Sequence, residues 1–353
     1  AFYIASAICQ PFSGFLVDRF GARVVLLAGL GLLAGATTLM GVFPLLPVML
    51  VLSVLAGIGN SVFHPCDYSI MNATINEGRM ARAFSLHMFG GYAGYVLAPV
   101  SMIFLGNLIG WQAAIIVAGA IGLILFAILW GGSRDFRDST HERAESGAAQ
   151  EPLKANIKTL TSAPVLMCWV FFFFTAMGQM GLMTFVPTLM HEIYSFDLQA
   201  AGAFVSVMIG AVMVGVLCGG YVGDFFRKPD LIVTAGYTTG AALVACIWQF
   251  DLTTWQLYGI FAVIGFLYGV VFPSRELLIR AATPKGASGR VFGFVYSGMD
   301  FGAALIPVLF GWFVDTGIPR TAFLCVAILW ILSVIVMLMT SMATKKQALA
   351  AAE

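Results

Sequence analysis

The sequence predicts an all-α membrane protein built from two pseudo-symmetric six-helix bundles. Three observations support this: the composition, the spacing of apolar runs and an internal repeat. Of 353 residues, 60% are hydrophobic and 10% are charged, whereas a soluble domain averages about 45–50% apolar and about 25% charged residues. This composition excludes a soluble enzyme, a disordered chain and a nucleic-acid binder. The net charge of +1 indicates no charged partner.

The apolar runs have the length of membrane-crossing helices. A helix needs about 20 apolar residues to cross roughly 30 Å of hydrocarbon. Eleven runs of this kind occur, near 1–18, 23–43, 46–71, 83–106, 112–131, 164–190, 200–222, 231–250, 255–279, 290–314 and 320–342. Most connections are short, so consecutive helices are expected to be antiparallel neighbours. The alternating pattern of a membrane β-barrel is absent.

One connection is longer and polar, and it divides the chain. We expect an N-terminal bundle at 1–131, a linker at 132–163, a C-terminal bundle at 164–342 and a tail at 343–353. Residues 133–160 carry five positive and five negative side chains. A solvated linker accounts for this composition, and a regulatory segment is the alternative.

The loops show a strong charge asymmetry. Lysine and arginine collect in alternate loops, in the long linker and near the C-terminus, whereas the opposite loops contain only Arg320. Such residues remain on the cytoplasmic side of a membrane. The sequence therefore predicts a multi-pass protein of the plasma membrane (bacterial inner membrane) with a cytoplasmic linker and C-terminus.

The sequence also repeats itself. Shifted by 208 residues, it matches without a gap over about 50 positions, and upstream the shift is 206. The matched pairs include Gly57 and Gly265, Pro65 and Pro273, Arg82 and Arg290, Gly94 and Gly302, Pro99 and Pro307, Gly14 and Gly220, and Asp18 and Asp224. Equivalent helices then have the same orientation, as in a parallel duplication. The helix at 164–190 has no partner in the first half, so we expect eleven visible helices of twelve, with the first one missing before Ala1.

A charged motif follows the first run. The segment from Gly14 to Arg23 resembles the signature between helices 2 and 3 of the major facilitator superfamily, and a weaker copy begins at Gly220. The resemblance implies the superfamily fold and assigns a gating role to Gly14, Asp18, Arg19, Gly21, Arg23, Gly220, Asp224 and Arg227. Physically, Gly14 permits close helix contact, and Asp18 could face the positive N-terminus of a neighbouring helix. A plain topogenic charge cluster is the alternative.

Glycine and proline recur in two equivalent helices. The elements are Gly90, Gly94 and Pro99 in one helix and Gly298, Gly302 and Pro307 in the other. The first resembles the G-x3-G-P element of proton-driven drug antiporters, although Ala98 replaces a glycine and Ser53 stands where those proteins carry an arginine. Packing by small residues is the alternative. Phe63-His64-Pro65 resembles fosmidomycin-resistance-type exporters.

Ionisable residues inside apolar runs are candidates for proton coupling, because burial of a charge in lipid is expensive. Asp300 lies ten residues after Arg290, about 15 Å into its helix. Desolvation favours its neutral form, so it is a candidate proton carrier. His64 and Asp67 share one helix face. We predict that these three groups couple transport to protons; a structural carboxylate at Asp300 is the alternative.

The substrate site is predicted from polar residues that the superfamily fold would place around a central cavity. These are Arg275, Glu276, Tyr92 and Gln179. The repeat places Asp67 at the position equivalent to Arg275, with Pro65 and Pro273 as equivalent hinges. Arg275 favours an organic anion as substrate. A structural pair, in which Glu276 neutralises Arg275, is the alternative.

The predicted function is secondary active transport of a small organic solute by alternating access, and the chain is not expected to be an enzyme. A uniporter, a sodium-coupled transporter or a non-transporting sensor are the alternatives. No phosphate-binding loop or metal-ligand cluster occurs, and the six cysteines lie apart in apolar runs. We therefore expect no cofactor and no metal. The expected partners are the substrate, protons and lipid, and the protein is expected to be a monomer.

Overall fold

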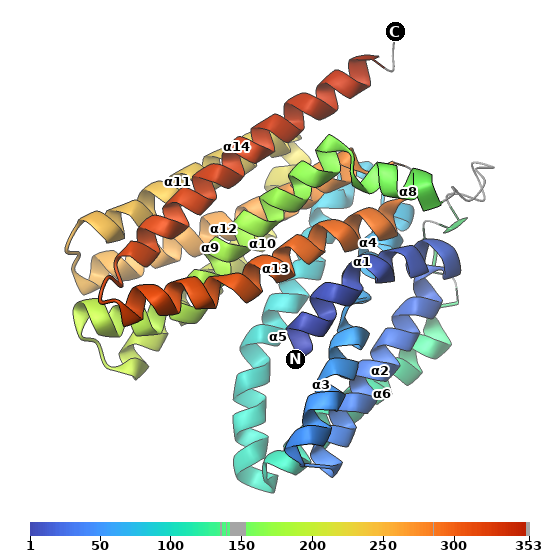
Figure 1. Cartoon of the computed structure of the whole chain (residues 1–353), viewed down its shortest axis with the longest axis horizontal. Coiled ribbons are helices and arrows are strands. Elements are labelled where there is room, and N and C mark those ends of the chain that lie inside the picture. Colours follow the sequence, from blue (N-terminus) through green and yellow to red (C-terminus); the bar gives the residue numbers. More distant parts are fainter. Residues whose placement is uncertain (135, 139, 142–152, 285, 351–353) are drawn as a thin grey trace. The chain divides into compact units, whose positions relative to one another are not determined.

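The computed structural model describes residues 1–134, 136–138, 140–141, 153–284 and 286–350. All regular elements of these residues are helices (Figure 1). They are α1 Phe2–Phe20, α2 Ala22–Val42, α3 Leu46–Asn60, α4 Phe63–Thr74, η1 Glu77–Arg79, α5 Met80–Ile109, α6 Trp111–Gly132, α8 Leu153–Leu160, α9 Ala163–Tyr194, α10 Leu198–Phe226, α11 Pro229–Gln249, α12 Thr254–Ala282, α13 Ser288–Asp315 and α14 Thr321–Ala350. The all-α prediction is confirmed. Linker residues 142–152, with their acidic side chains, lie outside the described residues.

Ten helical regions of the described chain are long and apolar enough to cross a membrane, where the sequence predicted eleven. The difference is α1, which is helical over 19 residues but is not one of the ten. Its face carries Ser6, Gln10, Ser13 and Asp18, all buried, and these polar side chains lower its hydropathy. Together α3 and α4 form one crossing region, Leu46–Thr74.

Contacts between residues divide the chain into two compact units. The first unit contains Ala1–Ile75, Ala93–Thr161 and Thr283–Asp300. The second contains Asn76–Tyr92, Ser162–Ala282 and Phe301–Glu353. Each unit thus includes a short segment from the other half of the sequence: the beginning of α13 packs in the first unit, and the beginning of α5 packs in the second.

The same helix pairs form in both halves of the sequence. Helix α3 packs on α1 and α2, and α2 packs on α6. In the second unit, α12 packs on α10 and α11, and α11 packs on α14. The repeat offset relates these pairs one to one, so the duplicated sequence produces a duplicated packing arrangement.

Two glycines show this equivalence at the level of atoms. A Cβ added at Gly57 would lie 2.3 Å from the backbone oxygen of Phe2, and one added at Gly265 would lie 2.2 Å from that of Met208. Phe2 and Met208 are themselves related by the offset of 206. Any larger residue would push the two helices apart, so glycine is required at both crossings.

The halves differ at their prolines. Helix α3 ends at Asn60 and α4 begins at Phe63, so the chain breaks at Ser61 and Val62. Pro65 therefore sits in the first turn of α4, where its missing N–H has no helical acceptor to lose. The equivalent Pro273 lies inside the continuous helix α12. The helix is thus interrupted in the first half only, and there Ser61 and Val62 keep backbone angles close to those of a helix.

Candidate functional site

The aspartate that ends α1 caps the beginning of α13. Asp18 accepts the backbone N–H groups of Gly289 and Arg290 at 3.1 and 3.2 Å. It also accepts the Arg290 guanidinium at 3.1 Å, and each of these two side chains is 6% exposed. We call Asp18, Gly289 and Arg290 the first clamp. It combines a buried ion pair with the attraction between a carboxylate and a helix N-terminus.

The equivalent aspartate of the second half makes two of these three contacts. Asp224 accepts the backbone N–H of Ala81 at 3.1 Å and the Arg82 Nε at 2.5 Å. We call Asp224, Ala81 and Arg82 the second clamp. The Arg82 side chain is 41% exposed and the Asp224 side chain 10%. Arg227, at the end of α10 with a φ of 49°, lines an open cavity beside this clamp.

At each clamp, a glycine of the motif allows two helices to pack closely. A Cβ at Gly14 would lie 2.3 Å from the backbone oxygen of Gly289. At Gly220 it would lie 2.7 Å from the Cβ of Ser85 and 3.1 Å from the Cα of Arg82. The two motif glycines therefore allow α1 and α10 to approach the helix starts that the aspartates cap.

Residues of the linker also form hydrogen bonds with the turn between α1 and α2. Gly21 adopts a φ of 87°, a conformation that favours glycine. The next N–H, of Ala22, donates to the Asp138 carboxylate at 2.6 Å, and Arg23 donates to the Ser133 hydroxyl at 3.0 Å. The linker residue Asp138 thus caps α2, while Arg19 of the motif is exposed.

Asp138 is 2% exposed but stays in its charged form. Burial alone would raise the pKa of its carboxyl, yet hydrogen bonds from Thr140, His141 and the Ala22 N–H outweigh burial and lower the pKa below its ordinary value. A charged carboxylate at this position stabilises the N-terminus of α2.

All four predicted substrate-binding residues lie along one chain of hydrogen bonds in the second unit. Arg275 donates to Glu276 at 3.0 Å and to the Tyr268 hydroxyl at 3.5 Å. The Tyr268 hydroxyl donates to the Gln179 side-chain oxygen. The Gln179 amide nitrogen donates to the Tyr92 hydroxyl at 2.7 Å. Helices α5, α9 and α12 therefore supply one connected polar group.

Aromatic rings enclose the charged end of this chain. The Arg275 guanidinium carbon lies 4.3 Å from the ring centre of Phe172 and 4.0 Å from that of Phe272. Arg275 is 1% exposed and Glu276 is fully buried. Stacking on ring faces and pairing with a carboxylate are how a guanidinium is stabilised away from water.

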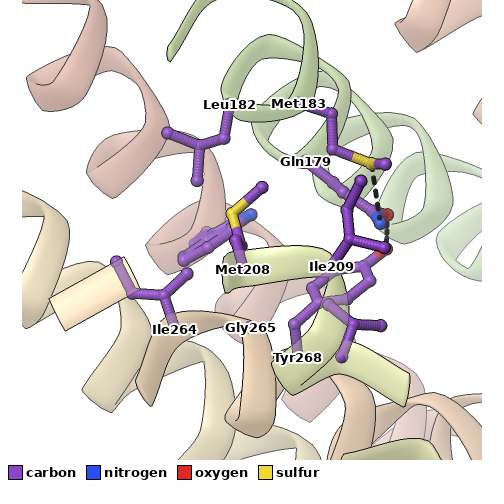
Figure 2. Close-up of a pocket in the computed structure, with 10 residues that line it drawn as sticks. Gln179, Leu182, Met183, Met208, Ile209, Ile264, Gly265 and Tyr268 are labelled. Atoms are coloured by element: carbon purple, nitrogen blue, oxygen red, sulfur yellow. Dashed lines mark hydrogen bonds between the residues drawn. The ribbon is translucent and has the colours of Figure 1, made fainter. Parts of the chain in front are cut away.

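A small cavity adjoins the middle of the chain (Figure 2). Gln179 and Tyr268 lie on its wall, and the rest of the lining is mostly apolar: Leu182, Met183, Met208, Ile209, Val212, Ile264, Gly265 and Trp330. Its volume is about 10 Å³, which is the space of one water molecule. An organic solute does not fit there.

The predicted proton-coupling residues lie in the first unit. The His64 ring stacks on Tyr296 with centres 4.2 Å apart. The hydroxyl oxygens of Tyr296 and Tyr68 are 2.5 Å apart, and Asp67 precedes Tyr68 on α4. Helices α4 and α13 therefore join His64 to a pair of tyrosines.

Asp300 lies on α13, one turn beyond Tyr296. Its Oδ2 is buried and has no hydrogen-bond partner among the residues that the structure describes. Arg290, at the start of the same helix, is engaged by Asp18.

The small residues predicted as packing or hinge positions fall into two kinds. A Cβ at Gly302 would lie 2.5 Å from the backbone oxygen of Phe173, so this glycine packs α13 on α9. A Cβ at Gly90 or Gly94 would meet no atom of the described chain within 4 Å. Pro99 and Pro307 lie inside continuous helices.

Sequence reasoning missed several residues of these groups. Tyr268 lies seven residues before Arg275, two helical turns along the same face, and this spacing was the available signal. Tyr296 and Tyr68 come from helices distant in sequence and carry no such signal. Asp138 is one acidic residue among many in the linker, and nothing in its neighbourhood marks it as a cap.

The duplicated helix packing, the paired clamps and polar residues buried in apolar helices define a multi-pass membrane transporter. The model of the Major Facilitator Superfamily matches residues 1–275 and 206–353, which together span the chain. The protein belongs to this superfamily. It is therefore a transporter of small solutes by alternating access, not an enzyme.

Relatives and solved structures agree with this assignment. A probable sulfoacetate transporter of Cupriavidus necator is 25% identical over 89% of this chain and 77% of the relative. The fosmidomycin resistance protein of Escherichia coli is 24% identical over 87% of this chain and 75% of the relative. The fucose:proton symporter of E. coli shares the fold with a TM-score of 0.78 at 13% identity, covering 96% and 88% of the two chains.

Proposed function

We propose that the protein carries a small organic anion across the bacterial inner membrane, coupled to protons. The observation that carries the anion assignment is the buried Arg275, the charged origin of a hydrogen-bond chain that reaches Gln179 and Tyr92. A cation inside membrane helices is expensive and marks a functional site by default. Glu276 balances this charge in the absence of substrate.

The names of relatives support the same class of substrate. Besides the probable sulfoacetate transporter, they include a 3-(3-hydroxyphenyl)propionate transporter of E. coli, 25% identical. Both names specify small molecules with an anionic group. A drug-like substrate is the second candidate, supported by the fosmidomycin resistance protein.

A panel of anions tests this proposal. The purified protein in proteoliposomes is offered sulfoacetate, 3-(3-hydroxyphenyl)propionate and fosmidomycin, and uptake is measured against empty liposomes. Uncharged analogues of matched size are the control. Selective uptake of at least one anion is expected, and uptake of none, or equal uptake of the uncharged analogues, would contradict the proposal.

Proton coupling is proposed for Asp300, with Asp67 and His64 as helpers. The support is the buried Oδ2 of Asp300 without a described hydrogen-bond partner and the stacking of His64 on Tyr296. The Asp300→Asn variant is expected to exchange substrate across the membrane but to lose accumulation driven by a pH gradient. Glu192→Gln, an exposed carboxylate, is the matched control.

Uniport and sodium coupling are the competing mechanisms. Flux measured at fixed pH with and without a sodium gradient separates them from proton coupling. A stimulation by sodium that persists in Asp300→Asn would show that Asp300 is structural.

The clamps have a proposed role in the transport cycle. The lysines and arginines on their side of the helices indicate the cytoplasmic face. On this proposal, access from the cytoplasm requires Asp18 and Asp224 to release the starts of α13 and α5.

We also propose that a single chain performs this cycle, with the linker and C-terminus in the cytoplasm.

A further inference from the structure

We propose that the cavity at the end of α10 binds the phosphate of an anionic phospholipid through Arg227. The inference goes beyond the proposed transport and does not depend on the identity of the substrate. Four features of the second unit support it: the conformation of Arg227, the cavity beside this residue, the charges in the cavity wall and the apolar side chains around it.

Arg227 has a backbone conformation that is unfavourable for an arginine. Its φ is 49°, and Gly21, its equivalent at the offset of 206, has a φ of 87°. The two N–H groups donate to equivalent carbonyl oxygens, those of Gly223 and Val17. Glycine adopts a positive φ without strain, whereas a residue with a β-carbon does so uncommonly. The local fold therefore does not explain the arginine, and strain of this kind is a mark of functional sites.

The two halves also differ in what lies beside these equivalent residues. In the first half, the linker carboxylate of Asp138 lies beside Gly21, and a Cβ there would be 3.1 Å from its Oδ2. In the second half, a cavity of about 430 Å³ is open beside Arg227, a volume typical of small-ligand sites. The guanidinium lies 3.9 Å from the position of a Cβ on Gly78, which also lines this cavity. An anionic group thus occupies the first position, and the second has room for one.

The cavity wall carries an uncompensated positive charge. Its two carboxylates both have cationic partners. Asp224 pairs with Arg82 at 2.5 Å, and the Glu77 carboxylate lies 4.0 Å from the guanidinium of Arg280. The Arg227 side chain makes no hydrogen bond or ion pair with any residue that the structure describes. A phosphate oxygen accepts strong, charge-assisted hydrogen bonds from a guanidinium, so a phosphate matches this wall.

Exposed apolar side chains beside the cavity indicate that the phosphate belongs to a lipid. They are Tyr221, Phe225 and Phe226 in the last turns of α10 and Leu231 in the first turn of α11. Helix α10 is long and apolar enough to cross a membrane. Aromatic residues at the ends of such helices lie at the level of the headgroups, where basic pockets between helices bind anionic lipids. Acyl chains would cover these side chains, whereas a soluble phosphate would leave them in water.

Native mass spectrometry of the purified full chain tests the site, with phosphatidylglycerol and phosphatidylcholine as probes. Wild type is expected to retain phosphatidylglycerol in preference to the zwitterionic phosphatidylcholine. Arg227→Gln keeps the β-carbon and removes the charge, so we expect phosphatidylglycerol to bind about tenfold more weakly, since one charge-assisted hydrogen bond is lost. Arg134→Gln, which removes an exposed arginine of the linker, is the matched control and should match wild type.

A second variant separates lipid binding from folding. Arg227→Gly removes the strain at the positive φ together with the side chain. It is expected to unfold at no lower temperature than wild type and to show the same weakening of phosphatidylglycerol binding. A loss of binding in this variant is therefore not a loss of the fold.

Three results would overturn the site. The first is equal binding of phosphatidylglycerol by wild type, Arg227→Gln and Arg227→Gly. The second is equal binding of the two lipids by wild type, which would indicate unselective contact with bulk lipid. The third is protection of wild type from thermal unfolding by inorganic phosphate as strong as that by phosphatidylglycerol, which would indicate a site for a free anion. None of these outcomes depends on whether the protein transports an organic anion.

Discussion

The two clamps use equivalent residues but lie in different surroundings, and Asp18 accepts two backbone N–H groups where Asp224 accepts one. Asp18 and Arg290 are each 6% exposed, whereas Arg82 of the second clamp is 41% exposed. A buried pair that loses one partner leaves an uncompensated charge, whereas an exposed pair is largely screened by water. The comparison teaches that duplicated sequence can keep the geometry of a contact and change its strength.

The helix starts that follow the two aspartate motifs, those of α2 and α11, are also stabilised differently. The start of α2 is capped by Asp138 from the linker. The equivalent start of α11 carries Pro229 in its first turn and Asp230, which accepts hydrogen bonds from the Leu231 N–H and from the Ser341 hydroxyl of α14. The turn beside the first clamp is therefore supported by the linker, and the turn beside the second clamp by α11 itself and by α14.

The largest expected effect is that of Asp18→Ala. It leaves the Arg290 guanidinium buried without its carboxylate, and we expect the free energy of unfolding to fall by about 3–5 kcal/mol. Thermal unfolding in detergent measures this. Asp315→Ala, exposed at the other end of α13, should change little. If Asp18→Ala and Asp224→Ala lowered the free energy of unfolding equally, the proposed difference between the two clamps would be wrong.

Gly14→Ala should come next. The new Cβ would lie 2.3 Å from a backbone oxygen of α13, so the helices must separate, at about 1–3 kcal/mol. Gly220→Ala meets the side chain of Ser85 first and should destabilise less. Unfolding of the two variants side by side checks the order, and the reverse order would contradict the difference between the clamps.

Asp224→Ala should destabilise by about 1 kcal/mol, because Arg82 can turn to water. The loss should shrink at high salt, since exposed charges are screened. Unfolding measured at low and high ionic strength tests this. A loss that salt does not change would mean that the second clamp is as buried as the first.

The smallest effect is expected from Asp138→Asn, and it depends on pH. Because the pKa of Asp138 is lowered in the folded protein, its charge stabilises the fold above the ordinary carboxyl pKa. That contribution is lost as the pH falls through the lowered pKa. Wild type should exceed the variant by up to about 1 kcal/mol near neutral pH and match it in acid. A difference that persists in acid would exclude a role of the charge.

The sequence was sufficient for the fold because its signals are redundant. Apolar runs define the helices, and the offset between Asp18 and Asp224 predicts their equivalence. Even the capping of a helix start by Asp18 could be expected from its place at the end of a span. Helix α1 shows the limit: Ser6, Gln10, Ser13 and Asp18 are buried polar side chains that lower its hydropathy, and the length of an apolar run does not reveal their burial.

The sequence was enough to identify most residues of the candidate site, but not to predict how their side chains are connected. Arg275, Glu276, Gln179 and Tyr92 were recognisable as polar groups in apolar helices. Their connection through Tyr268 depends on side-chain directions of three helices, which a linear pattern does not encode. Asp138 was hidden because its partner, the Ala22 N–H, lies 116 residues away.

The break between α3 and α4 has a consequence for motion. In the first half, α4 is joined to α3 by the two turn residues Ser61 and Val62, and the Ser61 hydroxyl is hydrogen-bonded to that of Ser13 at 2.7 Å. In the second half, α12 runs unbroken past Pro273. We expect the first half to bend at this joint while α12 tilts as a rigid rod, so the two repeats would take unequal shares of each conformational exchange.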